Sequence, residues 1–170
     1  MAPPSGKRLA WLRMLEAHTR LVELMEDDLR RDCGVPLAWY DVLIKIWLAP
    51  GHRIRMAELA EQVLLSRSWL TRRVVQLEDA GLVIRTGADG DGRGVLAEMT
   101  PTGLEAFEHM EQSHARSIAT HFSAHLSQDE ARVISTVFSR ISAALAPAPR
   151  RSPPGLPGKT ARPTAGSTTD

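Results

Sequence analysis

The sequence predicts a mainly α-helical domain with one small β-hairpin. Apolar residues recur at helical spacing in several stretches before residue 146, and proline or glycine separates these stretches. Two strand-like runs flank a glycine-rich, charged segment at 87–94. Residues 147–170 contain mostly Pro, Gly, Ser, Thr, Ala and Arg without apolar spacing. We therefore expect one folded domain over residues 7–146 and a disordered Pro/Gly/Ser/Thr-rich tail over 147–170.

The composition indicates the cellular compartment of the protein more clearly than it indicates a binding partner. The formal net charge of the 170 residues is only +1, so a nucleic-acid site must be argued from local groups of residues. Cys33 is the only cysteine and cannot form a disulfide within the chain. Plain burial is the favoured role for this thiol, and peroxide sensing is the alternative. The N-terminal region lacks the apolar run of a signal peptide or membrane span, which predicts a cytoplasmic protein without membrane contact.

A clear stop signal separates the first two helices. Residues 7–31 carry an apolar stripe, completed by His18, and predict one long helix. Pro36 cannot continue that helix and also restricts the residue before it. Residues 37–48 predict a second helix that is apolar on most sides, which is typical of a centrally packed helix. The stripe of the first helix is formed by Trp11, Leu15, Val22, Met25 and Leu29.

Two shorter helices are expected next. Ile54 is predicted to lie in a very short β-strand, and residues 56–63 are predicted to form a short helix. Ser66 can accept a backbone N–H as the N-cap of the following helix, and Gly81 suits the C′ position that closes it. The narrow buried seam of this helix is formed by Leu70, Val74 and Leu77.

A β-hairpin and two further helices complete the predicted domain. The strand-like runs are Leu82 to Thr86 and Val95 to Met99. The segment at 87–94 is too glycine-rich and charged to pack inside, so it forms the hairpin tip. Thr100, followed by proline, can cap a helix that extends to about His125. Ser127 and Glu130 form a capping box for the final helix.

Two short helices joined by a tight turn and followed by a hairpin with a basic tip are typical of a winged helix-turn-helix. The second helix of such a unit fits the major groove of duplex DNA, where its first residues reach base edges. Gln76, one turn beyond Arg72, is a candidate for a phosphate contact. The alternative is an ordinary solvated helix face. The remaining expected DNA contacts in this helix are Ser66, Arg67, Ser68, Thr71 and Arg72.

Five segments, taken in order, carry a family resemblance. They are Met56-Ala57-Glu58-Leu59-Ala60, Ser66-Arg67-Ser68-Trp69-Leu70-Thr71-Arg72, Leu77-Glu78-Asp79-Ala80-Gly81-Leu82-Val83, Asp91-Gly92-Arg93-Gly94 and Met99-Thr100-Pro101-Thr102-Gly103. Their order and spacing resemble the multiple antibiotic resistance regulator (MarR) family, over about Leu9 to Leu145. Two positions depart from the family pattern, because Trp69 replaces a small residue and Arg73 an apolar one.

The resemblance implies a homodimeric transcription regulator, most often a repressor, that binds a pseudo-palindromic operator in double-stranded DNA. It implies that residues 37–100 bind DNA and that residues 7–33 and 101–146 form the dimer. At the hairpin tip, it implies that Arg93 enters the minor groove and that Asp91 orients its guanidinium. It also implies release from DNA by a small aromatic or phenolic ligand.

Several aromatic residues and histidines leave alternatives open. Trp11, His18 and Trp39 are candidates to border the ligand pocket, although a role in the core is the favoured interpretation. His109, His114, His121 and His125 include one pair, 121 and 125, with the i, i+4 spacing of a metal-binding pair, but no cysteine pair or carboxylate cluster lies nearby in the sequence. Solvated histidines are therefore favoured, and we expect neither a metal nor a cofactor.

A DNA-binding regulator is the function that the sequence favours. The alternative is a winged-helix protein-interaction module without specific DNA binding. Such a module would not need arginine both in the recognition helix and at the hairpin tip. No Ser/His/Asp arrangement or nucleotide-binding loop can be assembled at a plausible site, so no enzymatic activity is expected.

Overall fold

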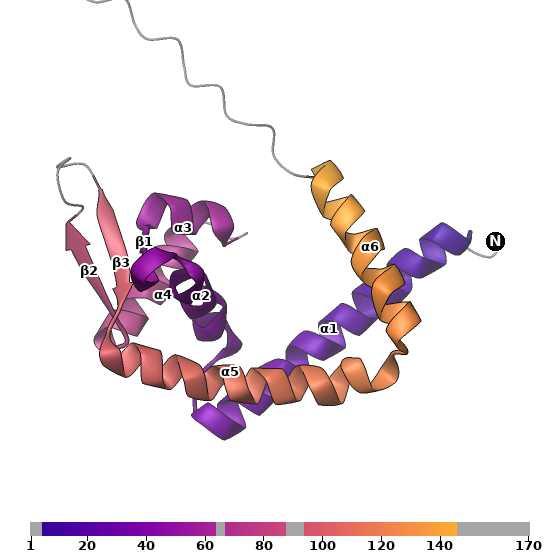
Figure 1. The fold of residues 1–170 in the computed structure, drawn as a ribbon, viewed down its shortest axis with the longest axis horizontal. Helices are drawn as coiled ribbons and strands as arrows, with labels where there is room; N and C mark the ends of the chain where they lie inside the picture. Colours follow the sequence, from indigo (N-terminus) through magenta and orange to yellow (C-terminus); the bar gives the residue numbers. More distant parts are fainter. Residues whose placement is uncertain (1–4, 64–66, 88–93, 146–170) are drawn as a thin grey trace, which may run out of the picture. The chain divides into compact units, whose positions relative to one another are not determined.

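The computed structural model describes residues 5–63, 67–87 and 94–145 (Figure 1). This part is mainly helical with one small antiparallel sheet, which confirms the fold class expected from the sequence. It divides into two compact units, one ending at Ser127 and one beginning at Gln128, and each is described by itself. The tail expected at 147–170 lies outside the described residues. Among the described helices, none is both long and apolar enough to cross a membrane.

Two long helices, α1 (Gly6–Cys33) and α5 (Pro101–His121), pack together in the first unit (Figure 1). Polar contacts join them. The carboxylate of Asp32 accepts hydrogen bonds from Ser113 Oγ at 2.8 Å and from Arg116 at 3.1 Å. These two hydrogen bonds lower the pKa of the Asp32 carboxyl, so the contact is made by the charged form.

The helix α2 (Leu37–Leu48) has the bounds that the sequence predicts and lies at the centre of the core. Its first N–H, that of Leu37, donates to Glu26 Oε2 of α1 at 2.7 Å. This bond satisfies one of the N–H groups that the start of every helix leaves unpaired. The apolar faces of α2 bury Val42, Leu43 and Ile46 completely, as expected for a helix surrounded by other elements.

The two short helices are α3 (Met56–Gln62) and α4 (Arg67–Asp79). A turn at Gly81, with φ of 72°, closes α4 as the sequence predicts. The N–H of Gly81 donates to the carbonyl of Glu78, and the N–H of Leu82 donates to the carbonyl of Leu77. This pair of bonds is the Schellman arrangement, in which glycine adopts the left-handed conformation at low cost.

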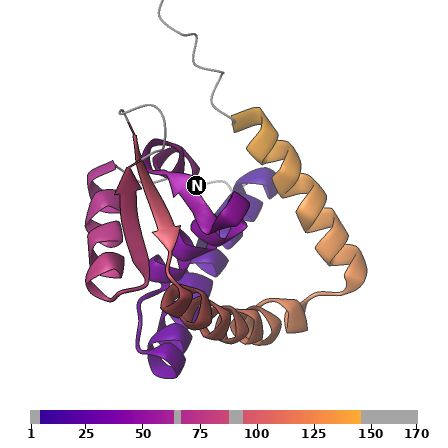
Figure 2. The same ribbon diagram turned by 60° about the vertical axis from the view of Figure 1, so that its left-hand side comes forward.

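The strands β1 (Arg53–Arg55), β2 (Val83–Gly87) and β3 (Val95–Met99) form an antiparallel sheet in the order β1-β3-β2. Ile54 pairs with Ala97, and Val83 pairs with Met99. All four side chains are buried, because alternate residues of each strand face the helices. Figure 2 shows the β2–β3 hairpin with α4 beside it.

The start of α5 is fixed to the turn that ends α4. Thr100 Oγ1 accepts the N–H of Gly103 at 2.9 Å and donates to the carbonyl of Gly81 at 2.7 Å. Thr100 therefore caps α5 and connects it to the Gly81 turn. Gly103 lies so close to this turn that a Cβ atom there would be 2.0 Å from the carbonyl oxygen of Leu82. Only glycine fits this contact.

One hydrophobic core holds the first unit together. It contains side chains from both long helices, from α2, α3 and α4, and from the sheet. Burial of each large apolar side chain contributes roughly 1.5–3 kcal/mol. The most completely buried apolar members are Leu29, Val42, Leu43, Ile46, Leu59, Leu70, Val74, Leu77, Val83, Ala97 and Phe107.

The structure differs from the sequence prediction at the end of α5. The α-helix stops at His121 rather than at about His125, and a short 3-10 helix, η2 (Ser123–His125), follows. Phe122, with φ of −121° and ψ of −61°, leaves the helical region. In the second unit, α6 (Gln128–Leu145) follows the predicted final helix. A second 3-10 helix, η1 (Pro50–His52), connects α2 to β1.

Candidate nucleic-acid interface

The helix α4 has a buried side and an exposed side. Leu70, Val74 and Leu77 are buried, as their spacing predicts. Ser68 and Thr71 are exposed on the opposite side, together with Arg72. The buried seam therefore holds the helix in place and leaves a row of polar side chains accessible. Ser66 and the side chain of Arg67, both expected to contact DNA, lie outside the described part of the chain.

The side chain of Gln76 is held by a neighbour within the same helix. Its Oε1 accepts a hydrogen bond from Arg73 Nη1 at 2.8 Å, and the side chain is half-buried. The guanidinium of Arg73 lies over the ring of Trp69, with Cζ 5.1 Å from the ring centroid. The two departures from the family pattern thus contact each other. The NH₂ group of the Gln76 amide is not used in this bond, and its N–H donors suit phosphate oxygens.

The hairpin is anchored to α4 by an ion pair that the sequence analysis missed. Arg85 Nε of β2 lies 2.6 Å from Glu78 Oε2, and the N–H of Arg85 donates to Glu78 Oε1 at 3.0 Å. The opposite charges on either side of the Gly81 turn were the only sequence signal. Asp91 and Arg93, the residues expected at the hairpin tip, lie outside the described residues. The contact fixes the base of the hairpin relative to α4.

Comparison with known proteins finds one family that is similar to part of this chain. A family model described as MarR family matches residues 34–94, which run from just before α2 to the residue before β3. This part of the chain is similar to proteins of the MarR family. The matched segment contains α4 and β2 and ends just before β3.

Proteins similar to this chain are described as transcriptional regulators. A putative transcriptional regulatory protein for the hcr operon of Thauera aromatica is 32% identical over 108 residues, which cover 64% of this chain and 63% of that protein. The match thus spans less than two thirds of that relative. Sco3205 of Streptomyces coelicolor, solved in complex with DNA, superposes with a TM-score of 0.80 at 28% identity, over 87% of this chain and 92% of that one. AbsC of the same organism superposes with a TM-score of 0.78 at 27% identity, over 85% of this chain and 98% of that one.

The residues expected to border a ligand pocket lie apart in the described part of the chain. Trp11 has 56% of its surface exposed, and His18 is also exposed, both on α1. Trp39 is half-buried and borders a hollow of about 460 Å³ between α2 and α4. Neither Trp11 nor His18 borders this hollow. Trp11 lies 22 residues before the end of α1, roughly 33 Å at the helical rise, so it is far from the start of α2.

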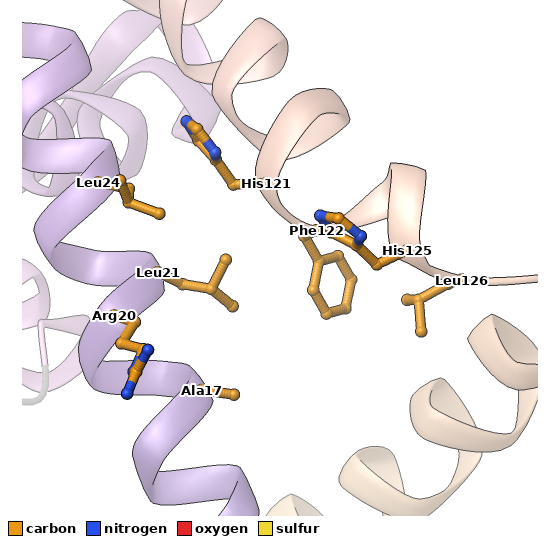
Figure 3. Close-up of a pocket in the computed structure, with 8 residues that line it drawn as sticks. All are labelled: Ala17, Arg20, Leu21, Leu24, His121, Phe122, His125 and Leu126. Carbon is orange, nitrogen blue, oxygen red and sulfur yellow. The ribbon is translucent and has the colours of Figure 1, made fainter.

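A second cavity, of about 310 Å³, lies between α1 and the end of α5 (Figure 3). Its wall is mostly aliphatic and aromatic, and Arg20, His121 and His125 supply the polar groups. His121 Nε2 lies 3.0 Å from Asp28 Oδ2, so this ring is paired across the two helices. The complete lining is Ala17, Arg20, Leu21, Leu24, His121, Phe122, His125 and Leu126.

Two of the histidines are more buried than the solvated positions that the sequence favours. His114 stacks on Tyr40 with 4.1 Å between ring centroids, and Tyr40 donates to Glu111 Oε2 at 2.5 Å. Burial lowers the pKa of His114, and burial with the bond to Glu111 raises the pKa of Tyr40. His114 and His121 are thus held in contacts between helices.

Cys33 is half-buried at the end of α1, and its Sγ lies 3.8 Å from Nδ1 of His109. Burial raises the pKa of this thiol. The protonated thiol is much less nucleophilic than the thiolate, so the site does not activate it. The described residues contain no group of three or more His, Cys, Asp or Glu side chains arranged for a metal ion.

Proposed function

We propose that this chain is a DNA-binding transcription regulator that binds its operator as a homodimer. The observation that carries the proposal is the exposed row of Ser68, Thr71 and Arg72 on a helix whose opposite side is fully buried. A rigid helix with exposed polar residues at its start suits the major groove, where such residues reach base edges. The likeness to Sco3205, which was solved with DNA, supports the same function.

The proposed homodimer uses the two segments that flank the DNA-binding part. In α1, Trp11, Leu12 and Leu15 are exposed on one stretch of helix. In α6, considered by itself, no residue is buried, and Leu145 has 76% of its surface exposed. Apolar surface of this extent indicates a protein partner, and a second copy of the chain is the simplest one. Residues 7–33 and 101–146 therefore form the dimer, and residues 37–100 bind DNA.

At the hairpin tip, Arg93 is proposed to enter the minor groove and Asp91 to orient it. Arginine suits a narrow, electronegative groove because its guanidinium is planar and weakly hydrated. The anchoring of β2 to α4 through Arg85 and Glu78 supports this assignment, because it gives the hairpin a fixed base next to the reading helix. The two roles predict that Arg93→Ala and Asp91→Ala both weaken binding to operators with A·T-rich flanks.

Repression, with release by a small aromatic or phenolic ligand, completes the proposal. A regulator of chromosomal genes acts in the cytoplasm and needs no catalytic activity. A pocket formed by Trp11, His18 and Trp39 would require residues of both protomers, since Trp11 and Trp39 are far apart within one chain. Such a ligand should weaken operator binding and quench tryptophan fluorescence.

A gel-shift with the DNA upstream of the chain's own gene tests the proposal. The parent chain should retard this fragment in the presence of excess unrelated duplex, and Arg72→Ala and Arg93→Ala should retard it only at higher protein concentration. Arg132→Ala is the matched control, because Arg132 is exposed on the other unit. Equal retardation of all duplexes by the parent, together with capture of a protein through α4, would favour the protein-interaction module instead.

A further inference from the structure

We infer that Arg73 makes a second DNA contact, to a phosphate of the strand beside the base-reading face of α4. The inference rests on the proposed function and extends it to a residue that the sequence analysis did not assign to the interface. Arg73 follows Trp69 by four residues and precedes Gln76 by three, so the three side chains share one flank of α4. This flank adjoins the exposed Arg72.

Two neighbours hold the guanidinium of Arg73 in place. The ring of Trp69 lies beneath it, 5.1 Å from Cζ to the ring centroid. On another side, Nη1 donates to Gln76 Oε1 at 2.8 Å. A cation that is already stacked and hydrogen bonded loses little further side-chain freedom when it binds. Arg73 therefore presents a pre-positioned positive charge.

This charge is not neutralised within the described part of the chain. Arg73 forms its hydrogen bond with a neutral amide and its stacking contact with an indole, and it has no carboxylate partner among the described residues. Its Nε is buried and makes no hydrogen bond there. Because Nε is enclosed, a phosphate oxygen would accept instead from the terminal nitrogens of the guanidinium, which carry its other N–H donors.

The hollow of about 460 Å³ lies in front of this guanidinium. The start of α2 and the flank of α4 border this open hollow, and the half-buried indole of Trp39 forms an apolar wall. Small-molecule sites usually bury most of their ligand, which an open hollow cannot do. A sugar–phosphate strand passing over the edge of the reading helix fits this shape better. The lining consists of Pro36, Trp39, Arg73, Gln76, Asp79 and Ala80.

Two carboxylates near the hollow oppose an anion. Glu26 is already engaged, because it accepts the N–H of Leu37 at 2.7 Å and pairs with Arg30 at 2.6 Å. Asp79 is exposed and borders the hollow, so it would repel a phosphate there. Changes at Arg73 and Asp79 should therefore alter DNA affinity in opposite directions.

The test measures the affinity of the full chain for a random-sequence duplex over a range of salt concentrations. A phosphate contact is independent of sequence, so no operator is required. Arg73→Gln should weaken binding and lower the slope of log K against log salt by about 0.9 for each phosphate that Arg73 neutralises in the parent. Arg73→Lys, which keeps the charge, should restore most of the slope. Asp79→Asn should strengthen binding.

Arg132→Gln and Asp129→Asn are the matched controls. These side chains are 76% and 82% exposed on α6, so both changes should leave the slope as in the parent. A parental slope in Arg73→Gln, with the parent bound to DNA, overturns the inference and leaves the proposed function standing. If circular dichroism shows that Arg73→Gln does not fold, the Asp79→Asn variant provides the test. DNA binding by Asp79→Asn that is unchanged from the parent, or weaker, then overturns the inference. A parent that binds no duplex at any salt concentration overturns both.

Discussion

Arg72 is the residue on which base reading depends most directly. It is exposed on α4, one helical turn before Gln76, and a bidentate contact from arginine to guanine is the commonest specific contact in the major groove. Arg72→Ala should therefore cost about 1–3 kcal/mol of operator affinity and relax the preference at one base position. Competition with operators changed one base pair at a time measures both effects. Equal weakening on every sequence would instead assign Arg72 to a phosphate.

His114 should make the stability of the fold depend on pH. Burial lowers the pKa of His114, although Glu111 and Asp41 act in the opposite direction. The unfolded chain then binds a proton at this ring more readily than the folded chain does. The free energy of unfolding should therefore fall as the pH is lowered through about 6.5, the ordinary histidine value. Urea titrations at about pH 7.5 and about pH 5.5 measure this difference.

His114→Gln should reduce this dependence on pH, because the variant has no ring to protonate. His18→Gln is the control, since His18 is exposed on α1 and should leave the dependence as in the parent. A His114→Gln protein whose unfolding free energy changes with pH as much as that of the parent would assign the effect to other groups.

At the level of residues, sequence reasoning found those positions that helical spacing determines. The buried seam at Leu70, Val74 and Leu77 leaves Ser68, Thr71 and Arg72 on the outside, whatever the details of packing. Sequence reasoning could not find contacts that depend on side-chain direction or on distant parts of the chain. Tyr40 and Glu111 are 71 residues apart, and only the folded chain brings them together.

Among the elements, the junction between the Gly81 turn and α5 is the most sensitive to substitution. A Cβ at Gly103 would lie 2.0 Å from the carbonyl oxygen of Leu82, so the backbone of the turn or of α5 would have to move. Gly103→Ala should therefore destabilise the fold by about 1–3 kcal/mol, in the range of overpacked cores. Urea denaturation followed by circular dichroism measures the change.

Gly6→Ala is the matched control for this substitution. Gly6 also lies at the start of a helix, but a Cβ there would meet nothing within 4 Å. Alanine has the higher helix propensity, so this variant should be as stable as the parent or slightly more stable. A Gly103→Ala protein that matches Gly6→Ala in stability would contradict the close approach at Leu82.

Element boundaries followed the sequence where proline or glycine sets them. The bounds of α2 and β3 match the prediction, and Gly81 ends α4 in the left-handed conformation. The end of α5 differs from the prediction, because Phe122 leaves the helical region without any proline or glycine to signal it. Such a break depends on packing at the end of the helix rather than on local propensity.

For the whole molecule, dimerisation is the first requirement of the account. The exposed apolar residues of α1 and α6 should be covered by a second chain. Analytical ultracentrifugation at micromolar concentration should give the mass of two chains. Val133→Asp with Phe138→Asp should shift the protein toward one chain, and the exposed Arg132→Gln should not. A parent that sediments as a single chain would contradict the dimer.

Specific recognition of duplex DNA is the central claim, and selection from a random duplex library tests it most directly. The parent chain should enrich one inverted repeat, with half-sites about 10 base pairs apart from centre to centre, because a two-fold dimer places its reading helices one helical turn apart. Arg72→Ala should enrich a less specific sequence at one position of each half-site. Enrichment of no common sequence after repeated rounds, by a folded and dimeric parent, would contradict the account.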